Sequence, residues 1–71
     1  MILTDGTHLV SDESRQELHR FARYIGLQRN WFQNRNFPHY ILKSLRMRNR
    51  ALRARAKFVT SVELIQRVNK K

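Results

Sequence analysis

SRQELHRFARYIG, residues 14–26, carries the clearest helical pattern in this 71-residue chain. Ser14 and Glu17 have the spacing of a capping box, in which each residue satisfies a free backbone N–H of the other. Apolar side chains then recur at the spacing of one helix face, namely Leu18, Phe21, Ala22 and Ile25. Gly26 stands where a left-handed C-terminal cap is expected. We therefore predict an amphipathic helix that ends at Gly26.

Short apolar runs on both sides of this helix predict β-strands. They are residues 2–4, 39–42 and 57–60, and a further apolar pair, Leu9-Val10, follows a turn at Asp5-Gly6. Residues 27–37 are rich in amide and aromatic side chains and are expected to form the main connection between the first helix and the strand that follows Pro38.

Two more helices are expected after residue 43. Ser44 can cap a helix from Leu45 to about Ala56, in which Leu45, Leu52 and Ala56 form a narrow apolar stripe suited to packing on a sheet. A second capping box, Thr60-Ser61-Val62-Glu63, opens the last helix, whose apolar face carries Leu64, Ile65 and Val68. The alternation predicts an α/β fold for residues 1–71 as a single domain. We expect about three strands in a parallel or mixed sheet and about three helices.

The charge of the chain is strongly asymmetric. Fifteen lysines and arginines against five acids give a formal net charge of +10, and residues 18–62 hold eleven basic side chains and no carboxylate. Self-repulsion on this scale destabilises a compact state. We therefore expect a polyanionic partner, with nucleic acid, either DNA or RNA, as the first hypothesis.

The predicted second helix carries the strongest functional signal. Arg46, Arg50 and Arg53 fall on one flank at i, i+4 and i+7, spaced so that they can meet successive phosphates. Each guanidinium can bind a phosphate in a bidentate manner. Four more arginines and one lysine are expected to assist: Arg48, Arg55, Lys57, Arg29 and Arg35. The alternative is a solvated helix face, although such faces usually mix acids with bases.

Aromatic side chains lie in the same acid-free segment. Trp31, Phe32, Phe37 and Tyr40 alternate with arginines and amides, a composition that suits the stacking of unpaired bases. A domain this small also needs large aromatic side chains in its core, and we interpret Trp31 and Phe37 as core residues.

Three histidines suggest an alternative chemistry. His8, His19 and His39, with Asp5 and Asp12, would supply ligands for a metal that activates water, as in a divergent metal-dependent phosphoesterase or nuclease. Their spacing matches no established metal-binding motif, and isolated histidines at the border of an apolar face are more often structural. A third hypothesis is an inhibitor that docks on an acidic host protein or on a ribonucleoprotein.

Composition limits the remaining classes. The chain has no cysteine, which excludes disulfides and thiolate zinc sites, and no apolar run approaches the roughly 18 residues of a membrane span. Neither flank of the arginine-rich helix has the broad apolar face of an interfacial membrane helix. We expect a soluble cytoplasmic protein without metal or cofactor that binds rather than catalyses.

Four motifs together resemble a known family. HLVSD at 8–12, ELHRFARYIGL at 17–27, WFQ at 31–33 and PHY at 38–40 are similar to the bacterial and bacteriophage family called domain of unknown function 4031. The resemblance covers nearly the whole chain and implies no activity. Family members commonly have an aspartate where this chain has Ile41, and a Gly-Ala where it has Arg55-Ala56. They are also less basic in the second helix, so we interpret the excess charge as a specialisation of a small nucleic-acid-binding accessory protein of bacterial or phage type.

Overall fold

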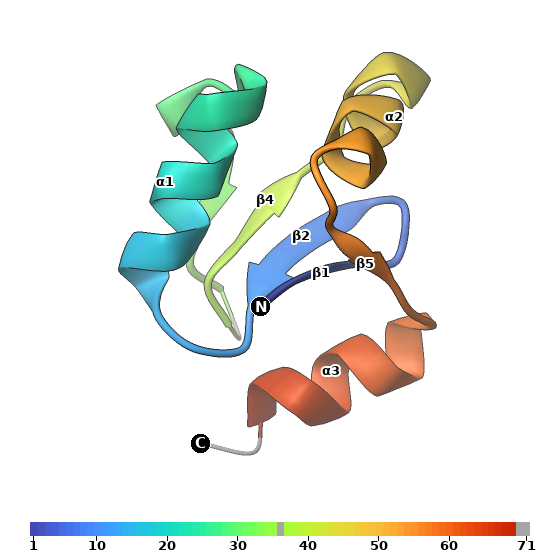
Figure 1. Ribbon diagram of the computed structural model, residues 1–71. Coiled ribbons are helices and arrows are strands. Elements are labelled where there is room, and N and C mark those ends of the chain that lie inside the picture. The colour runs from blue at the N-terminus through green and yellow to red at the C-terminus, as the bar shows by residue number, and fades with distance from the viewer. Residues whose placement is uncertain (36, 70–71) are drawn as a thin grey trace.

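A mixed β-sheet with helices on both faces forms the framework (Figure 1). The computed structural model describes residues 1–35 and 37–69, and these residues form five short strands. The strands are β1 (Ile2–Thr4), β2 (His8–Ser11), β3 (Phe32–Gln33), β4 (His39–Ile41) and β5 (Lys57–Phe58). Their order across the sheet is β3-β4-β2-β1-β5, with β5 parallel to β1 and the other neighbours antiparallel.

The predicted α/β fold and mixed sheet are confirmed, with five strands in place of about three. The apolar pair Leu9-Val10 belongs to a four-residue strand that forms a hairpin with β1. The second additional strand, β3, lies in the stretch predicted as a connection, where Phe32 pairs with Tyr40 of β4. Two residues are too few to produce the alternation of polar and apolar side chains that identifies a strand in a sequence.

Each α-helix begins at a side-chain cap that the sequence predicted. In α1 (Arg15–Ile25) the Ser14 hydroxyl accepts a hydrogen bond from the N–H of Glu17, and in α2 (Leu45–Arg53) Ser44 caps Met47 in the same way. Thr60 accepts the N–H of Glu63 at the start of α3 (Ser61–Asn69). A single 3-10 turn, η1 (Arg29–Trp31), connects α1 to β3. The described residues thus contain the three α-helices that were expected.

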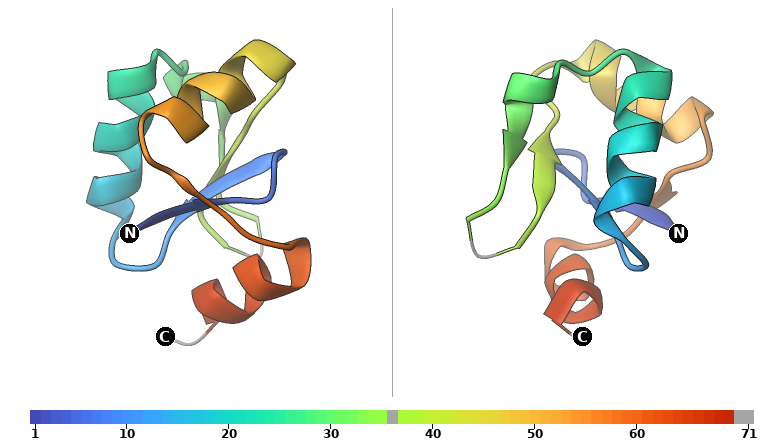
Figure 2. Two further views of the ribbon diagram at one scale, coloured as in Figure 1. Left: turned by 45° about the vertical axis from the view of Figure 1, so that its right-hand side comes forward. Right: turned by 90° about the vertical axis from the view of Figure 1, so that its left-hand side faces the viewer.

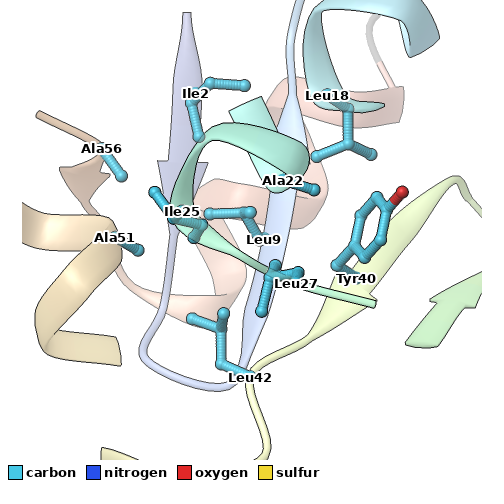
Figure 3. Packing of buried hydrophobic residues seen from close by; sticks show 10 residues of the cluster. All are labelled: Ile2, Leu9, Leu18, Ala22, Ile25, Leu27, Tyr40, Leu42, Ala51 and Ala56. Atoms are coloured by element: carbon cyan, nitrogen blue, oxygen red, sulfur yellow. The ribbon is translucent and has the colours of Figure 1, made fainter. Parts of the chain in front are cut away.

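The sheet separates two apolar clusters. α1 and α2 cover one face and α3 covers the other (Figures 1 and 2). Because successive side chains of a strand point to opposite faces, Leu9 packs in the cluster beneath α1 and α2 and its neighbour Val10 packs beneath α3. Tyr40 of β4, only 2% exposed, lies in the first cluster with side chains of α1 and α2 (Figure 3). Trp31 packs against the first cluster and Phe37 against the second, but both are only half-buried, so they lie at the edges of the core rather than inside it.

The face with which α2 packs matches the predicted stripe only in part. Ala56, just after the helix, is buried and Leu52 is half-buried, but Leu45 is 63% exposed. Ala51 is fully buried instead, and Met47 and Ala54 pack against the same cluster. An alanine allows the helix backbone to approach the core closely, so the packed face centres on Ala51. The flank with Arg46, Arg50 and Arg53 consequently faces solvent.

A left-handed residue ends both α1 and α2. At Gly26 φ is 87°, and the N–H of Leu27 donates to the carbonyl of Ala22. Arg55 has φ 76° and holds the equivalent position after α2, where the N–H of Ala56 donates to the carbonyl of Ala51. Both ends therefore have the hydrogen bonds of a Schellman motif. Glycine adopts this conformation freely, whereas an arginine is strained in it.

Candidate polyanion-binding surface

Three of the acids surround the N-terminal ammonium group. The nitrogen of Met1 lies 2.8 Å from carboxylate oxygens of Asp12 and Glu13 and 3.0 Å from one of Glu17. Burial alone would lower the pKa of this ammonium, but hydrogen bonds to the three carboxylates outweigh it and raise the pKa to about 10. The same three acids are the group among the described residues that is close enough to share a metal ion. The ammonium explains this arrangement without a metal.

The other two acids also have partners away from α2. The side chain of Asp5, 6% exposed, lies 3.1 Å from Nδ1 of His8 and accepts a hydrogen bond from the hydroxyl of Ser61 at 2.8 Å. Burial would raise its pKa, but hydrogen bonds from the backbone N–H groups of His8 and Thr7, and from Ser61 and His8 side chains, lower it to about 2. Glu63 pairs with Arg67 at 3.4 Å.

The arginines of α2 are therefore left without acidic partners among residues 1–35 and 37–69. Within those residues Arg67 is the arginine that forms ion pairs. Arg46, Arg50 and Arg53 are exposed and line a hollow of about 400 Å³, called here the α2 hollow, with Leu45 and Asn49.

A second hollow lies where α1 and α2 end. This helix-end hollow has a volume of about 470 Å³ and is lined by Arg23, Tyr24, Ile25, Gly26, Arg50, Arg53 and Ala54. Nη1 of Arg50 donates to the carbonyl of Ile25 at 3.1 Å, so a cation satisfies a free carbonyl at the negative end of α1. This hydrogen bond fixes the position of the Arg50 guanidinium in the helix-end hollow. Beside it the ring of Tyr24 is 79% exposed.

A third hollow extends the basic surface to η1. This His19 hollow has a volume of about 360 Å³ and is lined by Gln16, His19, Arg20, Arg23, Leu27, Arg29 and Tyr40. Arg23 lines this hollow and the helix-end hollow, and Arg50 and Arg53 line the helix-end and α2 hollows. The three hollows thus share walls. We call their six arginines the arginine surface: Arg20, Arg23, Arg29, Arg46, Arg50 and Arg53.

The structure brings together only part of the predicted phosphate-binding set. Arg46, Arg50 and Arg53 lie side by side as the helical spacing predicted, and Arg29 joins them at the far end of the arginine surface. Arg20 and Arg23 were missed. Their signal was present, because both lie in the acid-free segment at i and i+3, but only the packing of α1 beside α2 shows that they belong with the arginines of the second helix.

The four other predicted basic residues lie outside these hollows. Arg48 is half-buried against Gly6 of the β1–β2 turn, and its Nε has no hydrogen-bond partner there. Arg55 occupies the left-handed position after α2. Lys57 lies in the edge strand β5, and Arg35 lies in the β3–β4 connection, at the end of β4 opposite to α2. These four contribute to the net charge without lining the arginine surface.

The three histidines do not meet in one site. The rings of His8 and His39 have centroids 5.3 Å apart and both contact Phe37, on the α3 face of the sheet. His19 belongs to α1, on the opposite face of the sheet, and its Nδ1 is 2.7 Å from the hydroxyl of Tyr40. The alternation of side chains along β4 separates them, since His39 and Tyr40 are consecutive. Among the described residues, no group of three potential metal ligands includes a histidine.

A departure from the family pattern also falls beside these histidines. Ile41 pairs with His8 across β2 and β4, on the face that His39 shares. The aspartate expected there by resemblance would lie next to two imidazoles. Isoleucine supplies no ligand or proton acceptor, so the α3 face of this chain offers Asp5 as the carboxylate partner of His8.

The fold and the surface define a small α/β domain with a five-stranded mixed sheet and an arginine surface on one side. The chain belongs to the family described as "Protein of unknown function (DUF4031)", whose model matches residues 4–71. This confirms the resemblance found in the sequence. Comparisons with curated proteins and with solved structures gave no match. Within residues 1–35 and 37–69, no helix combines the length and the apolar character needed to cross a membrane.

Proposed function

We propose that the protein is a small nucleic-acid-binding accessory protein that contacts phosphates through the arginine surface. One observation carries the proposal: six guanidinium groups from α1, η1 and α2 line three adjoining hollows, while the described acids are engaged with other groups. In the part of the chain that the structure describes, no carboxylate lines the three hollows to neutralise these arginines. Phosphates of a nucleic acid strand would supply the countercharge.

Arginine chemistry suits the binding of phosphate groups. The guanidinium group is planar and always charged, and it binds two oxygens of one phosphate at once. Arg46 and Arg50 are one helical turn apart, and Arg23 continues the row across the groove to α1. A row of separate cations at this spacing fits a chain of separate anions. Contacts of this kind fix the position of the nucleic acid backbone but discriminate little between base sequences.

The exposed ring of Tyr24 favours a strand with unpaired bases. Its side chain lines the helix-end hollow between arginines of both helices, although a small domain gains stability by burying such rings. Stacking of one base on an aromatic ring contributes roughly 1–3 kcal/mol. A single strand can place its phosphates on Arg50 and Arg53 while a base stacks on Tyr24.

The test replaces Arg46, Arg50 and Arg53 together by glutamine. All three side chains are exposed, and the one structural contact that is lost is the hydrogen bond from Arg50 to the carbonyl of Ile25. The variant should therefore fold with slightly lower stability, and its affinity for single-stranded DNA and RNA should fall by at least tenfold at low salt. A control with the same loss of charge replaces Arg15, Arg35 and Lys57, which are also exposed but line none of the hollows of the arginine surface.

The control variant tests whether affinity depends on the arginine surface or only on the total charge of the protein. It should bind several times more tightly than the Arg46/Arg50/Arg53 variant, because it keeps the complete arginine surface. Equal weakening in both variants would refute a defined site, and unchanged affinity in the first would refute phosphate contact by α2.

A further inference from the structure

The His19 hollow differs from the other two hollows because buried core side chains line it together with arginines from α1 and η1. Three side chains come from one face of α1, at positions 16, 19 and 20, and Arg23 continues the same face one turn later. Arg29 approaches from η1. In the α2 hollow, by contrast, all the arginines come from one helix.

The bottom of this hollow is closed by the core. Leu27 is 7% exposed and Tyr40 is 2% exposed, and both line it. The hydroxyl of Tyr40 is held by His19 at 2.7 Å, and burial raises the pKa of this tyrosine, which keeps its proton in place. The bottom of the hollow is therefore formed by the hydrogen-bonded pair of His19 and Tyr40 and by the apolar side chain of Leu27.

The polar lining consists almost wholly of hydrogen-bond donors. Arg20, Arg23 and Arg29 donate through their guanidinium groups, and the amide of Gln16 can donate as well. Among residues 1–35 and 37–69, no carboxylate lines the hollow. Glu17, which follows the lining residue Gln16 in the sequence, is engaged by the Met1 ammonium and by the hydroxyl of Ser11. A bound anion would meet donors and no repelling group.

We propose that the His19 hollow is a binding site for a phosphate monoester, held by Arg20, Arg23 and Arg29. Three cations that line one hollow match a dianion better than the single charge of an internal phosphodiester. A closed bottom also suits a group at the end of a chain better than one in its middle. The ligand is either the terminal phosphate of a nucleic acid strand or the phosphate of a free nucleotide. The first source rests on the proposed function, whereas binding of the phosphate itself does not.

His19 supplies a built-in reporter of the bound anion. Its pKa is lowered by burial and then by the positive charges of Arg29 and Arg15. Other groups that line its surroundings are Arg20 and Arg23 of α1, Phe32 of β3 and Tyr40 of β4, and none of them is anionic. A phosphate among these arginines would offset their repulsion, so the pKa of the imidazole should rise when the anion binds.

The first measurement follows the imidazole resonances of His19 by NMR across pH, with and without inorganic phosphate. The pKa of His19 should rise in phosphate, while the resonances of His8 and His39, on the opposite face of the sheet, should not follow. In the Arg20→Gln/Arg29→Gln variant the rise should be lost. An unchanged His19 pKa in the wild-type protein at saturating phosphate would overturn the proposal.

The second measurement distinguishes the two sources of the phosphate. Oligonucleotides of one sequence are compared with a 5′-phosphate, a 3′-phosphate or hydroxyl groups at both ends, alongside the matching mononucleotide. New charge-assisted hydrogen bonds should make a phosphorylated strand or the mononucleotide bind about tenfold more tightly than its hydroxyl counterpart. The Arg20→Gln/Arg29→Gln variant should lose this difference, and an Arg46→Gln/Arg53→Gln control should keep it.

The outcomes separate this site from the proposed function. Salt-dependent binding of strands without any preference for a terminal phosphate would overturn the monoester site and leave the proposed function standing. Binding of phosphate and mononucleotide without binding of any strand would support the site and refute the proposed function.

Discussion

Arg55→Gly should stabilise the protein while it removes a positive charge. The backbone of Arg55 has φ 76°, within the Schellman motif that ends α2. A residue with a side chain pays about 1–2 kcal/mol for this left-handed conformation, and glycine does not. Glycine gains more freedom in the unfolded chain, which offsets part of the benefit. The net gain should be about 1 kcal/mol.

Thermal unfolding followed by circular dichroism measures this gain. For a domain of this size, about 1 kcal/mol corresponds to a rise in Tm of roughly 4–8 °C. The matched control is Arg55→Ala, which removes the same charge but keeps a side chain at φ 76°. Relief of charge repulsion affects both variants equally, so the difference between their Tm values isolates the backbone. Gly26→Ala should have the opposite sign, because its φ is 87° and an added Cβ would lie 3.0 Å from Nη1 of Arg50.

The result that would refute this reasoning is a Tm of Arg55→Gly equal to or below that of Arg55→Ala. The left-handed conformation would then not be strained, or α2 would not end where the structure places its cap. A stabilised Arg55→Gly protein with weakened affinity for nucleic acid would indicate that stability is sacrificed at this position for charge.

Two further predictions concern Asp5 and Tyr24. Folding lowers the pKa of Asp5 from 3.8 to about 2, so its ionised form contributes roughly 2 kcal/mol of stability above about pH 4, and this contribution should be lost as the pH falls through about 2. Asp5→Asn should therefore lower Tm at pH 7 and flatten the acid side of a curve of Tm against pH. An acid side that is the same in the variant and the wild type would contradict the lowered pKa. Tyr24→Ala should weaken binding of a single strand by roughly 5- to 150-fold, which corresponds to a stacking energy of about 1–3 kcal/mol, and should leave the affinity for duplex nearly unchanged. Tyr24→Phe keeps the ring and should bind as the wild type does. If titrations show that Tyr24→Ala weakens binding of both nucleic acids equally, stacking on this ring is excluded.

Local signals in the sequence predicted the elements well. The caps at Ser14 and Ser44 and the left-handed Gly26 determine where helices begin and end through hydrogen bonds between residues close in the chain. Such bonds depend on neighbours only, so a sequence reveals them. β3 escaped prediction because a two-residue strand has no period, and it exists through its pairing with β4.

Long-range packing set the limits of prediction for the site. The helical spacing placed Arg46, Arg50 and Arg53 on one flank, but not Arg20 and Arg23 beside them, since that depends on how α1 and α2 lie together. Packing also determines two features of the second helix that its helical spacing did not predict.

The first feature is the buried face of α2, and the second feature is the position of Arg48. Ala51, rather than Leu45, is the centre of the buried face because a small side chain lets the helix approach the core. Because α2 packs through Ala51, the side chain of Arg48 points inward against the β1–β2 turn, away from the arginine surface.

The most direct test of the arginine surface is the salt dependence of nucleic acid binding. Contact with about six phosphates gives a slope of log K against log salt concentration near −5 on duplex DNA, or about −4 on a single strand. The Arg46→Gln/Arg50→Gln/Arg53→Gln variant should lose about three of these contacts and flatten the duplex slope to about −3. An unstructured peptide with the same net charge serves as reference. The same slope for the wild type, the variant and the peptide would contradict a folded phosphate-binding surface, and a slope that flattens only in the variant would confirm it.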